Sequence, residues 1–193
     1  MKQDMITKKG VKTLVDDKKF MPSKREYIEE QFEKRNIYIA DMAELVFDSQ
    51  QRHIEGLDYE DAVRAVEAVM KKREVRHALL VALALDNLAM DNALPEPLQT
   101  IVAEDQPLFG VDEDIAVATS GLNGSIATTN YGHLDVSKPG IVGRLNQDQK
   151  DGKMITTFLD DMISAITAQA MGKLAHAYRY GIIKDHTNDI DDI

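Results

Sequence analysis

Three short acidic motifs in the second half of the chain carry the side chains most able to do chemistry. Together they supply five carboxylates and one lysine: Asp112, Glu113, Asp135, Lys138, Asp160 and Asp161. Hard divalent cations such as Mg²⁺ take oxygen ligands from a few carboxylates and keep other positions for water or phosphate oxygens. These residues therefore predict a site where a divalent cation meets a phosphate group, provided that the fold brings the three motifs together.

Each motif alone also has a simpler explanation. Acids in the first turn of a helix are favourable because of the helix dipole, by about 0.3–1 kcal/mol each. Thr157 and Asp160 have the spacing of a capping box, in which Asp160 would serve the start of a helix. The sequence Lys138-Pro139-Gly140 is also typical of a plain turn. The residues alone therefore leave both a metal site and these structural roles open.

The composition fits one globular domain and excludes several classes of protein. The chain has 193 residues, of which 44% are hydrophobic and 29% charged, as in ordinary globular proteins. Its longest apolar run, residues 78–85, is shorter than the roughly 20 residues of a membrane span. It has no cysteine, which excludes disulfides, thiolate catalysis and cysteine-bound zinc. The net charge of −10 argues against a nucleic-acid partner.

The first residues contain lysines but no apolar segment of the kind found in secretory signals. We therefore expect a cytoplasmic protein. Residues 1–22 are predicted to be a loosely packed arm, and its lysines are the candidate for peripheral contact with an anionic membrane. Residues 181–193 are predicted to be a frayed acidic tail.

Helical patterns fill the remaining domain, residues 23–180. Ser23 and Glu26 have the spacing of a capping box, which predicts a helix from Lys24. Further helices are predicted at about 37–51, 59–71, 73–92, 98–102, 112–129 and 156–180. The helix at 73–92 is apolar on most of its faces, which predicts that other helices enclose it. We expect an all-α fold, a compact helical domain of about six to eight helices.

Glycine and proline are frequent between the last two predicted helices. Gly132, Pro139, Gly140 and Gly143 predict a long loop there. In this interpretation Asp135 lies in the loop, whereas Asp112, Glu113, Asp160 and Asp161 lie at helix starts. His133, two residues before Asp135, could contact the phosphate or lie on the surface.

The motifs occur in an order that resembles one family of enzymes. The stretches that carry the resemblance are Gly110-Val111-Asp112-Glu113, Gly124-Ser125-Ile126, residues 129–140 and Thr157-Phe158-Leu159-Asp160-Asp161. They look like those of the phosphatidylglycerophosphatase A family, in the soluble branch found in Gram-positive bacteria. The resemblance covers roughly residues 37–178.

Members of that family are Mg²⁺-dependent phosphatases that convert phosphatidylglycerophosphate to phosphatidylglycerol. The resemblance implies that Asp112, Glu113, Asp135, Asp160 and Asp161 bind the metal or activate water. It also implies that Lys138 contacts the phosphate of a lipid headgroup or a related small molecule. The chain differs from the membrane-bound members in lacking their hydrophobic spans and in carrying Ala116 and Gly132 where they have glycine and arginine.

Two other functions fit the same acidic residues. One is a non-catalytic helical oligomer that keeps an acidic pocket for binding. The other is a helical nucleotide pyrophosphohydrolase, although such enzymes place acids three or four residues apart along helices, and here they form adjacent pairs. The amphipathic helices also predict a homo-oligomer.

Overall fold

The computed structural model describes residues 23–181, which form helices and no strand. The all-α prediction is therefore confirmed for this part of the chain. The α-helices are α1 (Lys24–Lys34), α2 (Ile39–Gln50), α3 (Tyr59–Lys71), α4 (Arg73–Met90), α5 (Leu98–Ala103), α6 (Val111–Ser120), α7 (Gly124–Ser137), α8 (Gly140–Lys150) and α9 (Leu159–Arg179). A short 3₁₀ helix, η1 (Gly121–Asn123), joins α6 to α7. The arm predicted at 1–22 and nearly all of the predicted tail lie outside the described residues.

Local capping signals in the sequence set the starts of two helices as predicted. The Ser23 Oγ accepts from the backbone N–H of Glu26 at 3.2 Å, and the Glu26 carboxylate accepts from the Ser23 N–H at 2.7 Å. Asp58 caps α3 in the same way through the N–H of Asp61. These reciprocal bonds satisfy backbone donors that the first turn of a helix leaves unpaired.

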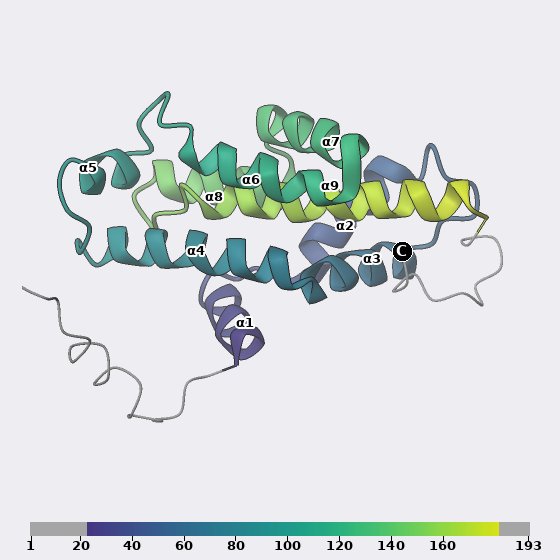
Figure 1. Cartoon of the computed structure of the whole chain (residues 1–193), viewed down its shortest axis with the longest axis horizontal. Coiled ribbons are helices and arrows are strands. Elements are labelled where there is room, and N and C mark those ends of the chain that lie inside the picture. The colour runs from purple at the N-terminus through teal and green to yellow at the C-terminus, as the bar shows by residue number, and fades with distance from the viewer. Residues whose placement is uncertain (1–22, 182–193) are drawn as a thin grey trace, which may run out of the picture.

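The centre of the molecule is α9, the long yellow-green helix in Figure 1. It contacts α2, α3, α4, α6, α7 and α8. All of its residues from Leu159 to Leu174 are buried. Gly172 allows α7 to come close, because a Cβ added there would lie 3.1 Å from the Ala127 Cβ. The first turn of α9 is therefore held in the middle of the fold.

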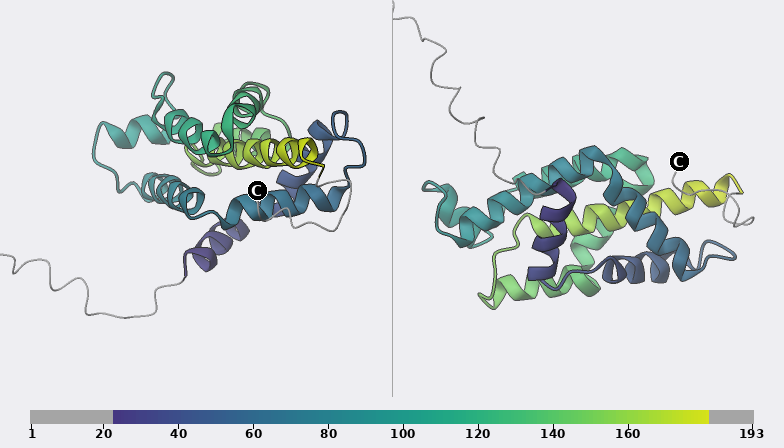
Figure 2. Two further views of the ribbon diagram at one scale, coloured as in Figure 1. Left: turned by 45° about the vertical axis from the view of Figure 1, so that its right-hand side comes forward. Right: turned by 90° about the horizontal axis from the view of Figure 1, so that it is seen from below.

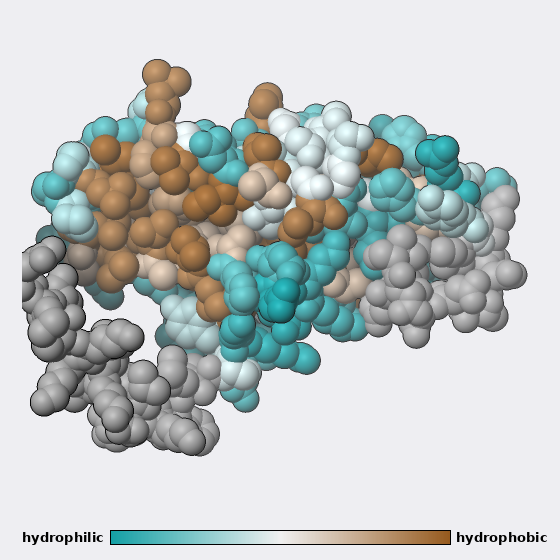
Figure 3. Space-filling view, viewed as in Figure 1, coloured by the Kyte–Doolittle hydropathy of each residue, from teal (hydrophilic) through white to brown (hydrophobic). Residues whose placement is uncertain are grey.

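The prediction that other helices enclose α4 was wrong. The outer face of α4 exposes Val81, Leu88 and Met90. Figure 3 shows apolar atoms gathered over the end of the molecule where α4, α5 and α6 lie in Figure 1. Helix α9 is the enclosed helix instead. Its small Ala, Ser, Thr and Gly side chains let neighbouring helices approach from all sides, although these residues are less hydrophobic than the Leu and Val residues of α4.

The prediction of a long loop between the last two helices was also wrong. Most of that region forms the second half of α7 and all of α8. The helix predicted at about 112–129 is divided between α6 and α7. Residues 23–181 therefore contain nine α-helices instead of the predicted six to eight. Only residues 151–158 connect α8 to α9. Gly143 lies inside α8, where a Cβ would lie 2.2 Å from the Lys138 carbonyl oxygen. A glycine at this position therefore allows close packing inside a helix and does not mark a loop.

Two further views show how the outer helices lie on this centre (Figure 2). Helix α1 crosses α4, which it contacts. None of the helices in residues 23–181 is long and apolar enough to cross a membrane.

Candidate metal and phosphate site

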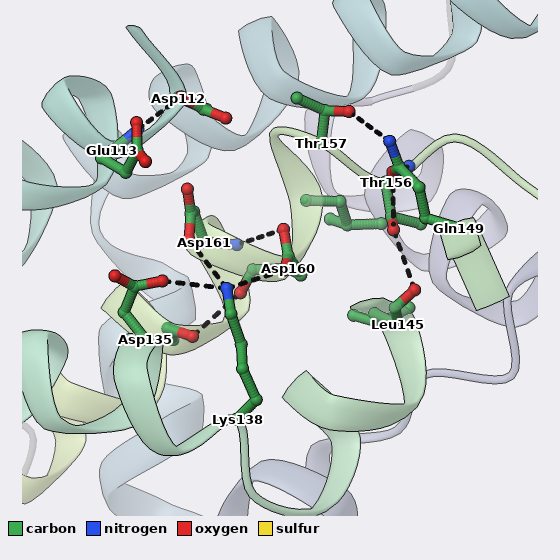
Figure 4. Close-up of polar contacts among 12 residues, drawn as sticks. Asp112, Glu113, Asp135, Lys138, Leu145, Gln149, Thr156, Thr157, Asp160 and Asp161 are labelled. Carbon is green, nitrogen blue, oxygen red and sulfur yellow. Dashed lines mark hydrogen bonds and ion pairs between the residues drawn. The ribbon is translucent and has the colours of Figure 1, made fainter. Parts of the chain in front are cut away.

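The three acidic motifs come together at the ends of three helices. Asp112 and Glu113 lie in the first turn of α6, and Asp160 and Asp161 in the first turn of α9. Asp135 lies near the end of α7, not in a loop as predicted, and Lys138 is the residue that ends this helix. Figure 4 shows Asp161 between Glu113 on one side and Lys138 on the other, with all these side chains directed toward one region.

Three carboxylates are close enough to share one cation. Single oxygen atoms of Asp112, Glu113 and Asp161 all lie within 4.8 Å of one another. Oxygens that bind the same Mg²⁺ or Ca²⁺ at 2.0–2.6 Å must fall within about this separation. Asp112 and Asp161 are buried, whereas Glu113 is exposed. The trio therefore combines two buried carboxylates with one exposed carboxylate.

Lys138 connects the remaining carboxylates to this trio. Its Nζ lies 2.9 Å from Asp135 Oδ1, 3.0 Å from Asp160 Oδ2 and 3.7 Å from Asp161 Oδ1. The backbone of Lys138 is left-handed, with φ of 44°, and its N–H donates to the Leu134 carbonyl at 2.8 Å. This helix end, followed by Pro139, turns the chain so that the ammonium group points at α9.

The site carries far more negative than positive charge, and its pKa values reflect this. Burial, followed by the charge of Asp160, raises the pKa of Asp161 to about 9. Burial together with Glu113 raises the pKa of Asp112 to about 7. Burial by itself would lower the pKa of the Lys138 ammonium group. The nearby carboxylates of Asp160, Asp135 and Asp161 outweigh burial and raise this pKa above its usual value. Lys138 therefore stays charged, whereas Asp161 keeps a proton at neutral pH that a cation would displace.

The donor set fits a hard divalent cation. It offers only carboxylate oxygens, which suit Mg²⁺ and Ca²⁺. Asp161 Oδ1 is buried and has no hydrogen-bond partner within the described part of the chain. A bound cation would neutralise the excess negative charge that burial leaves unbalanced. Asp112, Glu113 and Asp161 are the residues that would hold it.

A buried aspartate on α4 fixes the first turn of α9. Asp86, fully buried, accepts from the backbone N–H of Phe158 at 3.1 Å and of Leu159 at 3.0 Å. Thr157 does not cap the helix, because its hydroxyl donates to the Val102 carbonyl at 2.7 Å. Asp160 instead bonds Lys138 and accepts from the N–H of Asp161 at 3.0 Å. The capping-box alternative for Asp160 was therefore wrong.

The sequence reasoning missed Asp86 and Asp105. Asp86 interrupts the apolar run of α4, and a charged residue in such a run needs an internal partner. Asp105 follows α5 with a left-handed φ of 50°. Burial raises its pKa, and the charges of Lys138, Glu113 and Asp135 act on it, so it lies beside the site. Nothing in its local sequence distinguishes it from an ordinary turn residue.

Other residues noted in the sequence lie in varied surroundings. His133 and Gly132 are exposed on α7, and a Cβ added at Gly132 would meet no atom within 4 Å. Ala116 is fully buried on α6. His133 therefore fits the surface alternative.

The chain is similar to one family model, to known protein sequences and to solved structures. The family model for phosphatidylglycerophosphatase A matches residues 38–176. The protein YutG of Bacillus subtilis, described as uncharacterized, is 44% identical over 147 residues, which cover 76% of this chain and 87% of YutG. The crystal structure of the low temperature requirement C protein of Listeria monocytogenes has a TM-score of 0.77 and 40% identity, and the match covers 83% of this chain and 99% of that one. A Bacillus subtilis protein, ypjQ, also matches in structure, with a TM-score of 0.73, 37% identity, and coverage of 82% of this chain and 99% of that one.

Proposed function

Because the chain belongs to the phosphatidylglycerophosphatase A family, we propose that it is a Mg²⁺-dependent phosphatase that hydrolyses a phosphate monoester. The family points to phosphatidylglycerophosphate or a related molecule as the substrate. The observation that carries the proposal is the meeting of Asp112, Glu113 and Asp161 within 4.8 Å, next to the ammonium group of Lys138. This arrangement supports binding of a cation and a phosphate side by side.

The residues divide into two groups by what they can do. Asp112, Glu113 and Asp161 would hold Mg²⁺, which supplies Lewis-acid polarisation of the phosphoryl group when it is bound. Asp135 and Asp160 orient Lys138 through its bonds of 2.9 and 3.0 Å. These bonds take up two of the three ammonium hydrogens, so that one is left for a phosphate oxygen or for Asp161.

In the reaction, a water oxygen forms a new bond to phosphorus while the bond from phosphorus to the ester oxygen breaks. The water proton passes to a carboxylate of the cluster, and the leaving alcohol takes up a proton from solvent. Lys138 would stabilise the negative charge on the transferring phosphoryl oxygens. Burial of the acids strengthens these electrostatic interactions.

The test is phosphate release from a panel of substrates with Mg²⁺ and with EDTA. The panel contains phosphatidylglycerophosphate in mixed micelles, glycerol 3-phosphate and p-nitrophenyl phosphate. We expect release from at least one of them, with Mg²⁺ only, and its loss in Asp112→Asn. The matched control is Asp114→Asn, which removes an exposed acid from the same helical turn and should keep wild-type activity. No turnover of any substrate would favour the non-catalytic binding protein instead.

A further inference from the structure

The hydroxyl of Tyr131 is a buried polar group that has no hydrogen-bond partner among residues 23–181. Tyr131 lies on α7 and is only 3% exposed. Its ring belongs to the hydrophobic core, but its hydroxyl oxygen is buried without a hydrogen bond to any residue among 23–181. Buried hydroxyl groups are nearly always paired, because leaving them unpaired destabilises the fold. A phenylalanine would fill the same space without this penalty, so the hydroxyl calls for a partner other than residues 23–181.

The position of Tyr131 on α7 directs it at the acidic site. Tyr131 and Asp135 are spaced i and i+4, which places them on one face of α7, and Lys138 ends the helix three residues later. From this end of α7 the Lys138 ammonium group reaches Asp160 and Asp161 at the start of α9, and it also contacts Asp135. Tyr131 lies one turn earlier on the same face, where α7 packs against α9.

The negative charges of the site residues act on the hydroxyl of Tyr131. Burial raises the pKa of Tyr131 far above its usual range, and the charges of Asp161, Asp135, Glu113 and Asp160 raise it further. The group therefore keeps its proton and can donate a hydrogen bond to an anion. A donor of this kind suits an oxygen that carries negative charge.

A second unpaired atom lies in the same site. Asp161 Oδ1 is buried without a hydrogen bond in the described structure, because Lys138 Nζ at 3.7 Å is too far away. The site thus holds an unpaired donor, on Tyr131, and an unpaired acceptor, on Asp161, that do not bond each other. A cation at Asp161 that carries an anionic oxygen ligand would satisfy both.

From these observations we propose that the Tyr131 hydroxyl donates a hydrogen bond to an oxygen of the phosphate group bound at the acidic cluster. Tyr131 is then a substrate-binding residue on the α7 side of the site, beside Lys138. The inference rests on the proposed phosphatase function. A water molecule held between Tyr131 and Asp161 is the competing occupant, and the experiment separates the two.

The experiment compares wild-type protein with Tyr131→Phe, which removes only the hydroxyl group. The matched control is Tyr27→Phe, because the Tyr27 hydroxyl accepts from Asn87 Nδ2 at 3.2 Å away from the acidic cluster. Calorimetric titration measures the affinity for Mg²⁺ alone and for inorganic phosphate in the presence of Mg²⁺. Thermal unfolding without ligands measures the structural role of each hydroxyl.

We expect Tyr131→Phe to weaken phosphate binding about tenfold and to lower kcat/KM for phosphate release by about 10²-fold. The affinity for Mg²⁺ alone and the unfolding temperature should stay at the wild-type values or rise. Tyr27→Phe should leave both affinities unchanged.

One result would overturn the inference while leaving the phosphatase proposal intact: equal phosphate affinity in wild type and Tyr131→Phe. If the unfolding temperature of Tyr131→Phe is then also lower than that of the wild type, the hydroxyl is assigned to a structural water. If the wild type binds Mg²⁺ but neither binds nor releases phosphate, the phosphatase proposal itself fails and the role of Tyr131 fails with it.

Discussion

Asp86 accepts a hydrogen bond from the backbone N–H of Phe158 at 3.1 Å, across 72 residues of sequence. Its other oxygen accepts from the next backbone N–H, that of Leu159. The carboxylate is fully buried, and burial raises its pKa well above its usual range despite these bonds. Helix α4 thus holds the start of α9, where two of the site acids lie two and three residues after Phe158.

This contact predicts that Asp86→Asn destabilises the protein. An amide keeps one acceptor oxygen but turns an NH₂ group toward the other backbone N–H, which leaves a buried donor unpaired. We expect the free energy of unfolding to fall by about 1–3 kcal/mol, measured by urea denaturation. Affinity for Mg²⁺ should fall as well, because the first turn of α9 is less firmly held. Asp91→Asn, an exposed position at the end of the same helix, is the control, and equal unfolding midpoints for the two variants would contradict the capping role.

Lys138→Gln tests whether the lysine serves the phosphate or only balances charge. We expect phosphate release to fall by about 10²-fold or more, because the charge that would stabilise the phosphoryl oxygens is gone. Mg²⁺ should bind at least as tightly as in wild type, because a competing positive charge has left the acids. Titration calorimetry and a phosphate-release assay measure the two effects. Lys34→Gln, on the exposed side of α1, is the control, and a variant that loses Mg²⁺ binding together with activity would argue against the phosphate role.

The raised pKa values of the acids predict an unusual pH dependence of stability. In the folded protein the pKa of Asp161 is raised to about 9 and that of Asp112 to about 7, whereas an unfolded aspartate titrates near 3.8. Between these values the folded state binds more protons than the unfolded state, so the free energy of unfolding decreases as pH rises. The metal-free protein should therefore lose stability steadily from about pH 4 to pH 9.

Mg²⁺ should reverse this trend, because it binds the deprotonated carboxylates. The increase in unfolding temperature on adding Mg²⁺ should grow with pH over the same range. Thermal unfolding at several pH values, with EDTA and with Mg²⁺, measures both effects. The slope without metal should be smaller in Asp161→Asn. A metal-free protein that becomes more stable toward pH 9 would show that these acids are not protonated in the folded state.

Features set by neighbouring residues could be predicted from the sequence. The starts of α1 and α3 follow from Ser23 and Asp58, whose side chains bond backbone groups three residues away. The gathering of the acidic motifs was also anticipated, because their order resembles that of a known family. Both depend on information that the sequence displays directly.

Features set by distant contacts could not be predicted. Gly143 looks like a loop residue until the Lys138 carbonyl oxygen is seen to occupy the space of its Cβ. The partner of Asp86 lies on another helix, and the site position of Asp105 depends on how α5 and α6 are placed around it. The homo-oligomer predicted from the amphipathic helices stays a prediction, and light scattering of the full chain would measure it.

The most direct test of the central claim is the Mg²⁺ dependence of phosphate release, measured side by side for wild type and Asp161→Asn. The account predicts that release by the wild type rises with Mg²⁺ to a plateau and stops with EDTA. In Asp161→Asn it should be at least about 10²-fold slower at every Mg²⁺ concentration, while the variant remains folded. Release that persists in EDTA, or wild-type release by Asp161→Asn, would contradict a phosphatase built on this acidic cluster.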